Sequence, residues 1–197
     1  MLEKDKCLKK INLLIIFFII CFSKSLVAEN ISAKLINYNK NLKNSSALFI
    51  QTNGESVEEG VIYFGDERIK IDYIKPTKLT LILSEKKGVY INHELKESQY
   101  FNTNKSYVRV FFKIFNKKKF TDKSDILVSE NTIEISESVD LNNNFYNIKI
   151  IYENNPIKLR KIKILNGGET LELGFFNYNI EEKFRKNFFS MVDPYLH

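Results

Sequence analysis

Cysteine is nearly absent from this 197-residue chain. Only Cys7 and Cys21 occur, and both lie within the first 28 residues. The remainder of the chain therefore has no disulfide, no zinc site built on cysteine and no thiol nucleophile. A domain folded from residues 29–197 must be stabilised by packing and hydrogen bonding alone.

Histidine is also rare, with His93 and His197 as the only two. A catalytic dyad or a paired-histidine metal site needs such residues in a defined grouping, and the chain also lacks a phosphate-binding glycine loop. The many carboxylates alternate with apolar residues, as Glu134 does between Ile133 and Ile135. That pattern is typical of the solvated face of a sheet. We therefore expect no enzymatic activity, no cofactor and no metal site.

A large excess of charge of one sign is missing too. The net charge is +6, but residues 1–28 contribute five lysines against Glu3 and Asp5 and so account for half of it. The excess that remains is too small to indicate a nucleic-acid footprint. We expect no nucleic-acid partner.

One long apolar run is present. It spans Ile11–Phe22, follows Lys9 and Lys10, and precedes small residues that end at Ala28. The run is shorter than the roughly 20 residues that a membrane-spanning helix needs, and the order of basic, apolar and small residues is that of a secretory signal. We predict a signal peptide at 1–28 and one exported domain at 29–197.

Two alternatives exist for this N-terminal region. The first is an uncleaved anchor helix that begins near Leu8. The second is a lipid-modified Cys21, although Ile20 stands where a small residue is normally required.

Aromatic residues are abundant, with 16 Phe and 10 Tyr. Apolar and polar residues alternate along much of the chain, most clearly over Arg68–Tyr73, and such alternation between turn signals predicts antiparallel strands. The fold class is therefore α+β, mainly β. We predict helices at 29–46 and 106–115, and strands at 47–51, 59–65, 68–73, 79–83, 89–92, 98–101, 126–129, 132–136, 146–152, 157–165 and 170–176.

The second predicted helix has an apolar stripe. Val108, Phe111, Phe112 and Phe115 recur at the i, i+3, i+4 and i+7 spacing of one helix face. The basic run Lys117–Lys119 follows, where cations suit a helix C-terminus.

A curved sheet of about eleven strands encloses more volume than its own side chains fill, unless helices plug it. The interior is then either a solid core or a cavity for an acyl chain. The alternative to a cavity is that the aromatic residues simply pack the core. The candidates for lining a cavity are Phe49, Tyr73, Leu81, Tyr90, Phe111 and Phe112.

The order of motifs over residues 46–103 resembles the outer-membrane lipoprotein carrier (LolA) family. That family opens with a helix and a strand of the form Ala-x-Phe-x-Gln, which Ala47–Gln51 matches. A Gly-led strand corresponds to Gly60–Phe64, and an aromatic-ended strand running into proline corresponds to Ile71–Pro76. A hydrophobic strand, a turn and an aromatic strand follow over Leu79–Ile91.

The resemblance implies an unclosed antiparallel β-barrel of about eleven strands capped by helices. It also implies a periplasmic carrier that takes acylated lipoproteins from an inner-membrane release complex and delivers them to the outer membrane, to an acceptor if one is present. The 106–115 helix would be the lid, with Val108, Phe111, Phe112 and Phe115 on it. We expect a monomer.

The sequence departs from the family at one position. The family has Arg-Pro just after the second strand, where this chain has Gly65 and Asp66, so Arg68 is the candidate lid latch. Two other functions are compatible with the same fold. One is a periplasmic sensor of lipids or misfolded proteins, and the other is an outer-membrane receptor anchored through Cys21.

Overall fold

The computed structural model describes residues 31–105, 108–115, 124–141 and 143–196. The predicted signal peptide and the basic run at 117–119 lie outside these ranges. Within them, no helix combines the length and the hydropathy that crossing a membrane requires.

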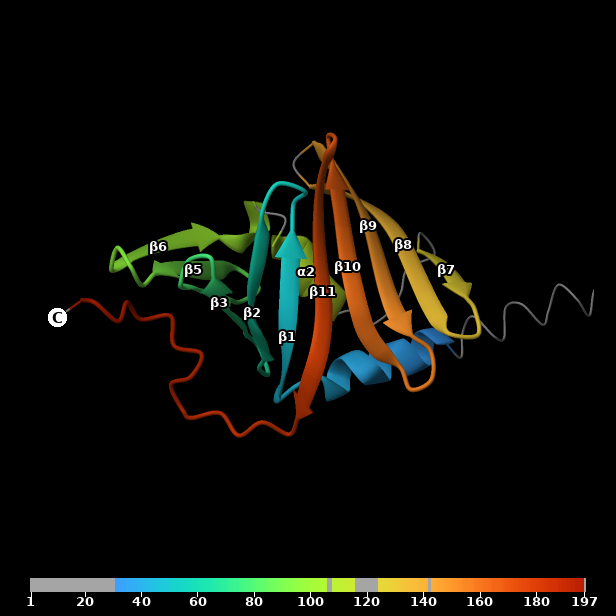
Figure 1. Ribbon diagram of the computed structural model, residues 1–197, viewed down its shortest axis with the longest axis horizontal. Helices are drawn as coiled ribbons and strands as arrows, with labels where there is room; N and C mark the ends of the chain where they lie inside the picture. The colour runs from blue at the N-terminus through green and yellow to red at the C-terminus, as the bar shows by residue number, and fades with distance from the viewer. Residues whose placement is uncertain (1–30, 106–107, 116–123, 142, 197) are drawn as a thin grey trace, which may run out of the picture.

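All eleven strands of these described ranges join a single antiparallel sheet (Figure 1). Their order is β6-β5-β4-β3-β2-β1-β11-β10-β9-β8-β7, so β1 and β11 pair in the middle and β6 and β7 stand at opposite ends. The sheet is therefore unclosed, and the predicted mainly-β fold of eleven antiparallel strands is confirmed. The strands are β1 (Ser45–Thr52), β2 (Val57–Phe64), β3 (Ile69–Lys75), β4 (Leu79–Leu83), β5 (Lys87–Asn92), β6 (Glu97–Asn102), β7 (Asp125–Val128), β8 (Thr132–Leu141), β9 (Asn144–Glu153), β10 (Lys158–Asn166) and β11 (Glu169–Ile180).

In the part of the chain that the structure describes, two helices pack on one face of this sheet, which we call the inner face. The first covers residues 31–41, and the second is α2 (Val108–Phe115), which follows a short 3-10 turn at Thr103–Lys105. Figure 1 shows α2 behind the central strands and the first helix across the lower ends of β9 and β10. The capping of the open sheet by helices is thus as predicted.

The first helix ends earlier than the predicted 29–46. Asn44 adopts a left-handed conformation with φ 58°, which stops a helix because only single residues tolerate it. Its backbone N–H donates to the carbonyl of Phe64 at 2.7 Å, and the Ser45 hydroxyl donates to the carbonyl of Leu42 at 2.5 Å. Ser45 and Ser46, predicted as helical, are instead the first residues of β1.

Strand register places the large apolar residues together on the inner face. Phe49 on β1 lies opposite Phe175 on β11, and Ile162 on β10 lies opposite Ile150 on β9, which itself lies opposite Ile135 on β8. Period-two alternation thus becomes a continuous apolar surface across the whole sheet.

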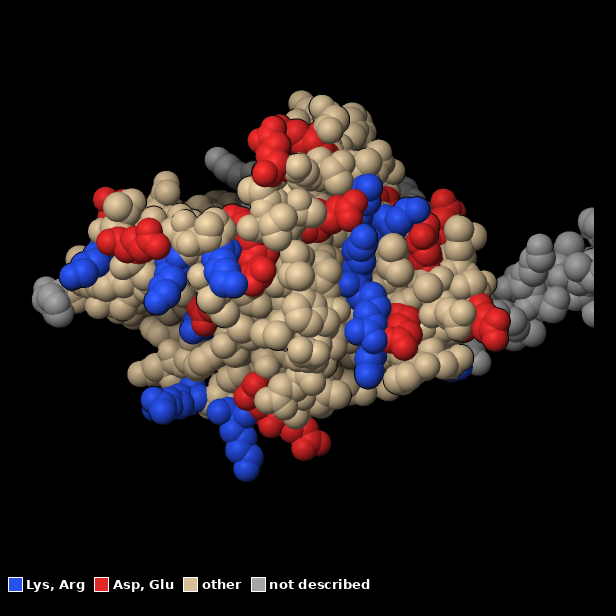
Figure 2. All heavy atoms as spheres, viewed as in Figure 1, with Lys and Arg blue, Asp and Glu red and all other residues tan. Residues whose placement is uncertain are grey.

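The outer face of β8–β11 is charged. Figure 2 shows Lys and Arg side chains in a column over β10 with Asp and Glu beside them. Glu172 pairs with Lys163 at 2.9 Å and with Lys161 at 3.1 Å, and Lys149 pairs with Glu134. Alternation along these strands therefore gives one wet face and one buried face.

Replacing Glu172 with glutamine is expected to lower the free energy of unfolding by less than about 1 kcal/mol at neutral pH, because these ion pairs are solvent-exposed. Hydrogen bonds from Lys163 and Lys161 lower the pKa of the Glu172 carboxyl. The stability it contributes is present above the unfolded-chain pKa and is lost as the pH falls through the lowered folded-state pKa.

Urea unfolding of parent and Glu172→Gln should therefore differ at neutral pH and converge once the pH has fallen below the lowered pKa of Glu172. Glu169→Gln, at the start of the same strand, is the matched control. A difference that persists undiminished in acid would contradict the role of this ion pair.

Residues 181–196 leave the end of β11 and cross the outer face of the other half of the sheet (Figure 1). There a second, smaller apolar cluster of Ile82, Val89 and Ile91 is covered by Met191 and Tyr195 of this segment. The C-terminal segment therefore buries apolar surface that alternation would otherwise leave in water.

Candidate functional site

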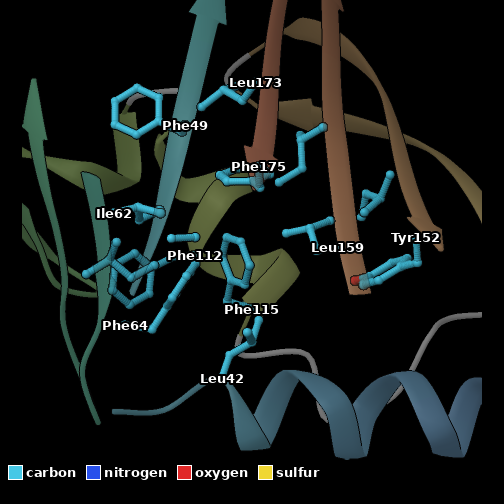
Figure 3. Close-up of a cluster of buried hydrophobic side chains, with 14 of the residues drawn as sticks. Leu42, Phe49, Ile62, Phe64, Phe112, Phe115, Tyr152, Leu159, Leu173 and Phe175 are labelled. Carbon is cyan, nitrogen blue, oxygen red and sulfur yellow. The ribbon is translucent and has the colours of Figure 1, made fainter. Parts of the chain in front are cut away.

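The space between the inner face and the two helices is filled by apolar side chains (Figure 3). The first helix contributes Leu35 and α2 contributes Phe112 and Phe115, all buried. The sheet contributes a larger set: Phe49, Ile62, Phe64, Ile133, Ile135, Ile150, Tyr152, Leu159, Ile162, Leu173 and Phe175. In this conformation the helices plug the half-barrel.

Cavities lie at the edge of this core, two of them where the first helix ends. One of about 190 Å³ lies between residues 39–43, the β2–β3 turn and α2. A second, of about 440 Å³, lies on the other side of the β2–β3 turn. A third, of about 820 Å³, lies between the end of the first helix, the β9–β10 turn and the end of β11. Lys40, Leu42 and Lys43 line both the first and the third.

The 190 Å³ cavity has an apolar interior and a charged rim. Leu42, Phe64, Phe112 and Phe115 line it, and the Phe64 and Phe115 rings lie with centroids 5.0 Å apart at an angle of 55°. Its rim carries Lys40, Glu67, Arg68 and the ion pair between Lys43 and Asp66. Such a site suits a molecule with an apolar body and a polar end.

The predicted lid residues fall at this cavity. Phe112 and Phe115 line it, and Val108 is buried one turn earlier in α2. Phe111 lies within α2, but its side chain is outside the described part of the chain. The stripe predicted from spacing therefore faces the core at the three positions that the structure describes.

The predicted cavity-lining residues share the inner face but occupy its packed part. The Phe49 and Tyr73 rings meet edge to face with centroids 5.1 Å apart, and the Tyr73 hydroxyl donates to Gln51 Oε1 at 3.1 Å. Leu81 lies opposite Tyr90 across β4 and β5, and both are half-buried. None of these four residues lines the three cavities, so a hollow bounded by them would require the helices to move.

Arg68 stands between the cavity at α2 and the C-terminal segment. It lines the 190 Å³ and the 440 Å³ cavities, and its Nη1 donates to the carbonyl of Phe189 at 2.6 Å. The bond that the structure shows for this guanidinium thus goes to the C-terminal segment. Its role as a lid latch stays a prediction.

Sequence reasoning missed a tyrosine cluster that holds the first helix against β9–β11. The Tyr38 hydroxyl accepts from the backbone N–H of Leu159 at 3.0 Å, and the Tyr178 hydroxyl donates to the carbonyl of Leu159 at 2.6 Å. The Tyr152 hydroxyl donates to Asn39 Oδ1 at 3.3 Å. Burial raises the pKa of each of these three tyrosines, because a phenolate would be desolvated there.

These tyrosines keep the first helix in place against β9–β11. The hydrophobic periodicity of the first helix gave no signal for this tyrosine cluster, because Tyr38 follows Ile36 in an ordinary amphipathic pattern. To predict it, one would have to know that Tyr38 lies beside Tyr152 of β9 and Tyr178 of β11, and only the folded arrangement of these strands brings the three together.

Within the part of the chain that the structure describes, no group of three or more His, Cys, Asp and Glu side chains is arranged to hold a metal ion. The candidate site is the 190 Å³ cavity, with its apolar interior and charged rim.

No family model matches this chain, and no curated protein sequence matches it. Solved structures with a similar strand arrangement include a chain of the MucA/MucB complex of Pseudomonas aeruginosa, with 10% identity, 81% coverage of this chain and a TM-score of 0.46. This chain spans 59% of that one. An uncharacterized conserved protein of Thermus thermophilus has 9% identity, coverages of 77% and 89%, and a TM-score of 0.48.

A third similar structure is a Vibrio parahaemolyticus domain proposed to sort outer-membrane lipoproteins. It has 10% identity, coverages of 82% of this chain and 97% of that one, and a TM-score of 0.45. At these identities and TM-scores the similarity is one of overall strand arrangement, and the function has to be argued from the chain's own residues.

Proposed function

We propose that this protein is a periplasmic carrier that shields the acyl chains of lipoproteins and delivers them from the inner to the outer membrane. It acts by binding, without catalysis. The observation that supports the proposal is α2: a short amphipathic helix covers the apolar inner face of an open sheet, and its Phe112 and Phe115 line a cavity with a charged rim.

The conformation in which α2 packs on the inner face is the cargo-free one, and we call it closed. A cavity of about 190 Å³ is smaller than the roughly 300 Å³ at which ligand pockets begin. Displacing α2 would remove Val108, Phe112 and Phe115 from the core and expose the inner face beneath them. The acyl chain then occupies the space that these side chains leave, and the apolar stripe of α2 lies against it.

The free energy needed to displace α2 and the free energy gained by burying one acyl chain are of comparable size. Exposing three buried side chains of this kind costs about 5 to 9 kcal/mol, at about 1.5 to 3 kcal/mol each. An acyl chain of about sixteen carbons gains about 12 kcal/mol on leaving water, at about 0.8 kcal/mol per CH₂. One chain therefore offsets the opening of α2 and leaves a small surplus, which suits a carrier that must also release its cargo.

A reversible cross-link of α2 tests the proposal. Asp66 and Phe115 line the same cavity, so cysteines at both positions are within reach of a short, cleavable thiol linker, with Cys7 and Cys21 replaced by serine. The linked protein should lose binding of a fluorescent triacylated lipopeptide, and cleavage of the linker should restore it. The single-cysteine variants are the controls. Equal binding by linked and cleaved protein would contradict the proposal.

A further inference from the structure

The C-terminal segment 181–196 follows one row of outer-face residues across five strands. Strand register places Tyr63 opposite Lys70, Lys70 opposite Ile82, Ile82 opposite Val89 and Val89 opposite Tyr100, from β2 to β6. The segment meets this row from one end to the other, so it crosses the strands rather than pairing with any one of them.

The row holds the segment through side chains. The Tyr63 and Phe188 rings meet edge to face at 4.9 Å, and Lys70 Nζ lies 4.3 Å from the centroid of Phe188. Farther along, the Tyr100 hydroxyl donates to the carbonyl of Met191 at 2.9 Å. Among the described residues, no backbone-to-backbone hydrogen bond joins 183–196 to a strand, and a segment held in this way belongs to the less stable part of a fold.

The segment also contacts the β2–β3 turn, which forms part of the rim of the 190 Å³ cavity. The ring of Phe189 occupies the space beside Gly65, where an added Cβ would lie 2.9 Å from two of its atoms. The carbonyl of Phe189 accepts from Arg68, and the carbonyl of Arg68 accepts from the N–H of Gly65 at 2.8 Å. One residue of the C-terminal segment thus packs on the turn and bonds to it.

We propose that the C-terminal segment is a strap that controls access to the cavity by clamping the β2–β3 turn through Phe189. The inference rests on the proposed function for what enters the cavity, but the clamp itself is a property of the chain alone. With the strap in place, the turn and its ion pair to Lys43 close the rim over Phe112 and Phe115. With Phe189 released, the turn loses its packing partner and the rim opens.

Thiol reactivity measures this coupling without cargo. Ile69 begins β3 directly after the turn, is buried and lines the cavity, so Ile69→Cys reports on the rim when Cys7 and Cys21 are replaced by serine. Ile135→Cys, buried on β8, reports on the rest of the core. Phe189→Ala should raise the rate of modification at position 69 at least tenfold and leave the rate at position 135 unchanged.

Two further variants control the experiment. Val192→Ala alters an exposed residue of the same segment (73% exposed) and should change neither rate. Gly65→Ala crowds both the Phe189 ring and the backbone oxygen of Arg68, at 2.9 Å each, so it disturbs the turn directly and should also raise the rate at position 69. An unchanged rate at position 69 in Phe189→Ala, or an equal rise at both positions, would overturn the proposal.

Uptake of the triacylated lipopeptide separates the two proposals. Faster uptake by Phe189→Ala than by the parent supports the strap as a regulator of the acyl site. If neither protein binds the lipopeptide while the rate at position 69 still rises in Phe189→Ala, the result supports the control of the β2–β3 turn by Phe189 and contradicts the carrier function.

Discussion

Replacing Phe112 with aspartate should weaken binding of an acylated cargo by at least about 100-fold, because burying an uncompensated carboxylate against an acyl chain costs several kcal/mol. Phe112 is buried on α2 and lines the cavity at its base. The same change in the Phe111/Phe112 pair should abolish binding. Co-purification with the triacylated lipopeptide, followed by native mass spectrometry, measures the effect.

The matched control is Phe145→Asp, the same substitution at a phenylalanine that is 68% exposed on β9. It should bind cargo like the parent. Phe112→Leu keeps an apolar side chain and should retain binding to within a few-fold. The eleven-stranded sheet does not depend on α2 for its ladders, so the far-ultraviolet circular dichroism of Phe112→Asp should stay that of the parent. Lipopeptide that still co-purifies with Phe112→Asp would show that α2 does not cover the site.

Gly60→Ala is expected to be the most destabilising small substitution in the sheet. A Cβ on Gly60 would lie 2.2 Å from the backbone oxygen of Asp72 and 2.7 Å from the ring of Phe49. The oxygen belongs to the paired strand and cannot move without breaking the ladder, so the loss should reach about 3 kcal/mol or more, above the usual range for overpacking. Thermal unfolding should shift down by about 6 to 12 °C for a domain of this size.

Gly88→Ala provides the comparison. Its Cβ would also be crowded, at 2.3 Å, but by the ring of Phe101, a half-buried side chain that can rotate away. A loss of about 1 kcal/mol is expected, near the average for a single substitution. Equal stabilities of the two variants would show that Gly60 is not the point where β2, β3 and Phe49 meet.

The strand pattern was predictable because burial acts on every second residue of a strand. Arg68–Tyr73 alternates in sequence, and β3 buries Ile69 and Ile71 as that alternation requires. The first helix was predicted too long, since the left-handed Asn44 is fixed by a hydrogen bond to Phe64 at the end of β2. Helix propensity carries no information on a bond formed between segments.

The candidate site was predictable only in part. The i, i+3, i+4, i+7 stripe on α2 indicated which residues face the core, and Phe112 and Phe115 do line a cavity. The same pattern could not tell a plugged interior from a hollow one. Phe49 and Tyr73 form a ring pair in the packed region, while the cavity lies at the turn after β2, where Arg68 contacts the C-terminal segment.

The sequence by itself determined the number of strands, their antiparallel connections and the amphipathic stripe of α2, since each follows from local periodicity and from turns between neighbouring segments. The tertiary structure alone decided that Phe189 lies against Gly65, that three tyrosines anchor the first helix, and that the interior is closed by α2. Those contacts join residues more than a hundred positions apart in the chain or depend on how side-chain volumes fill a shared space. Local sequence periodicity carries information on neither.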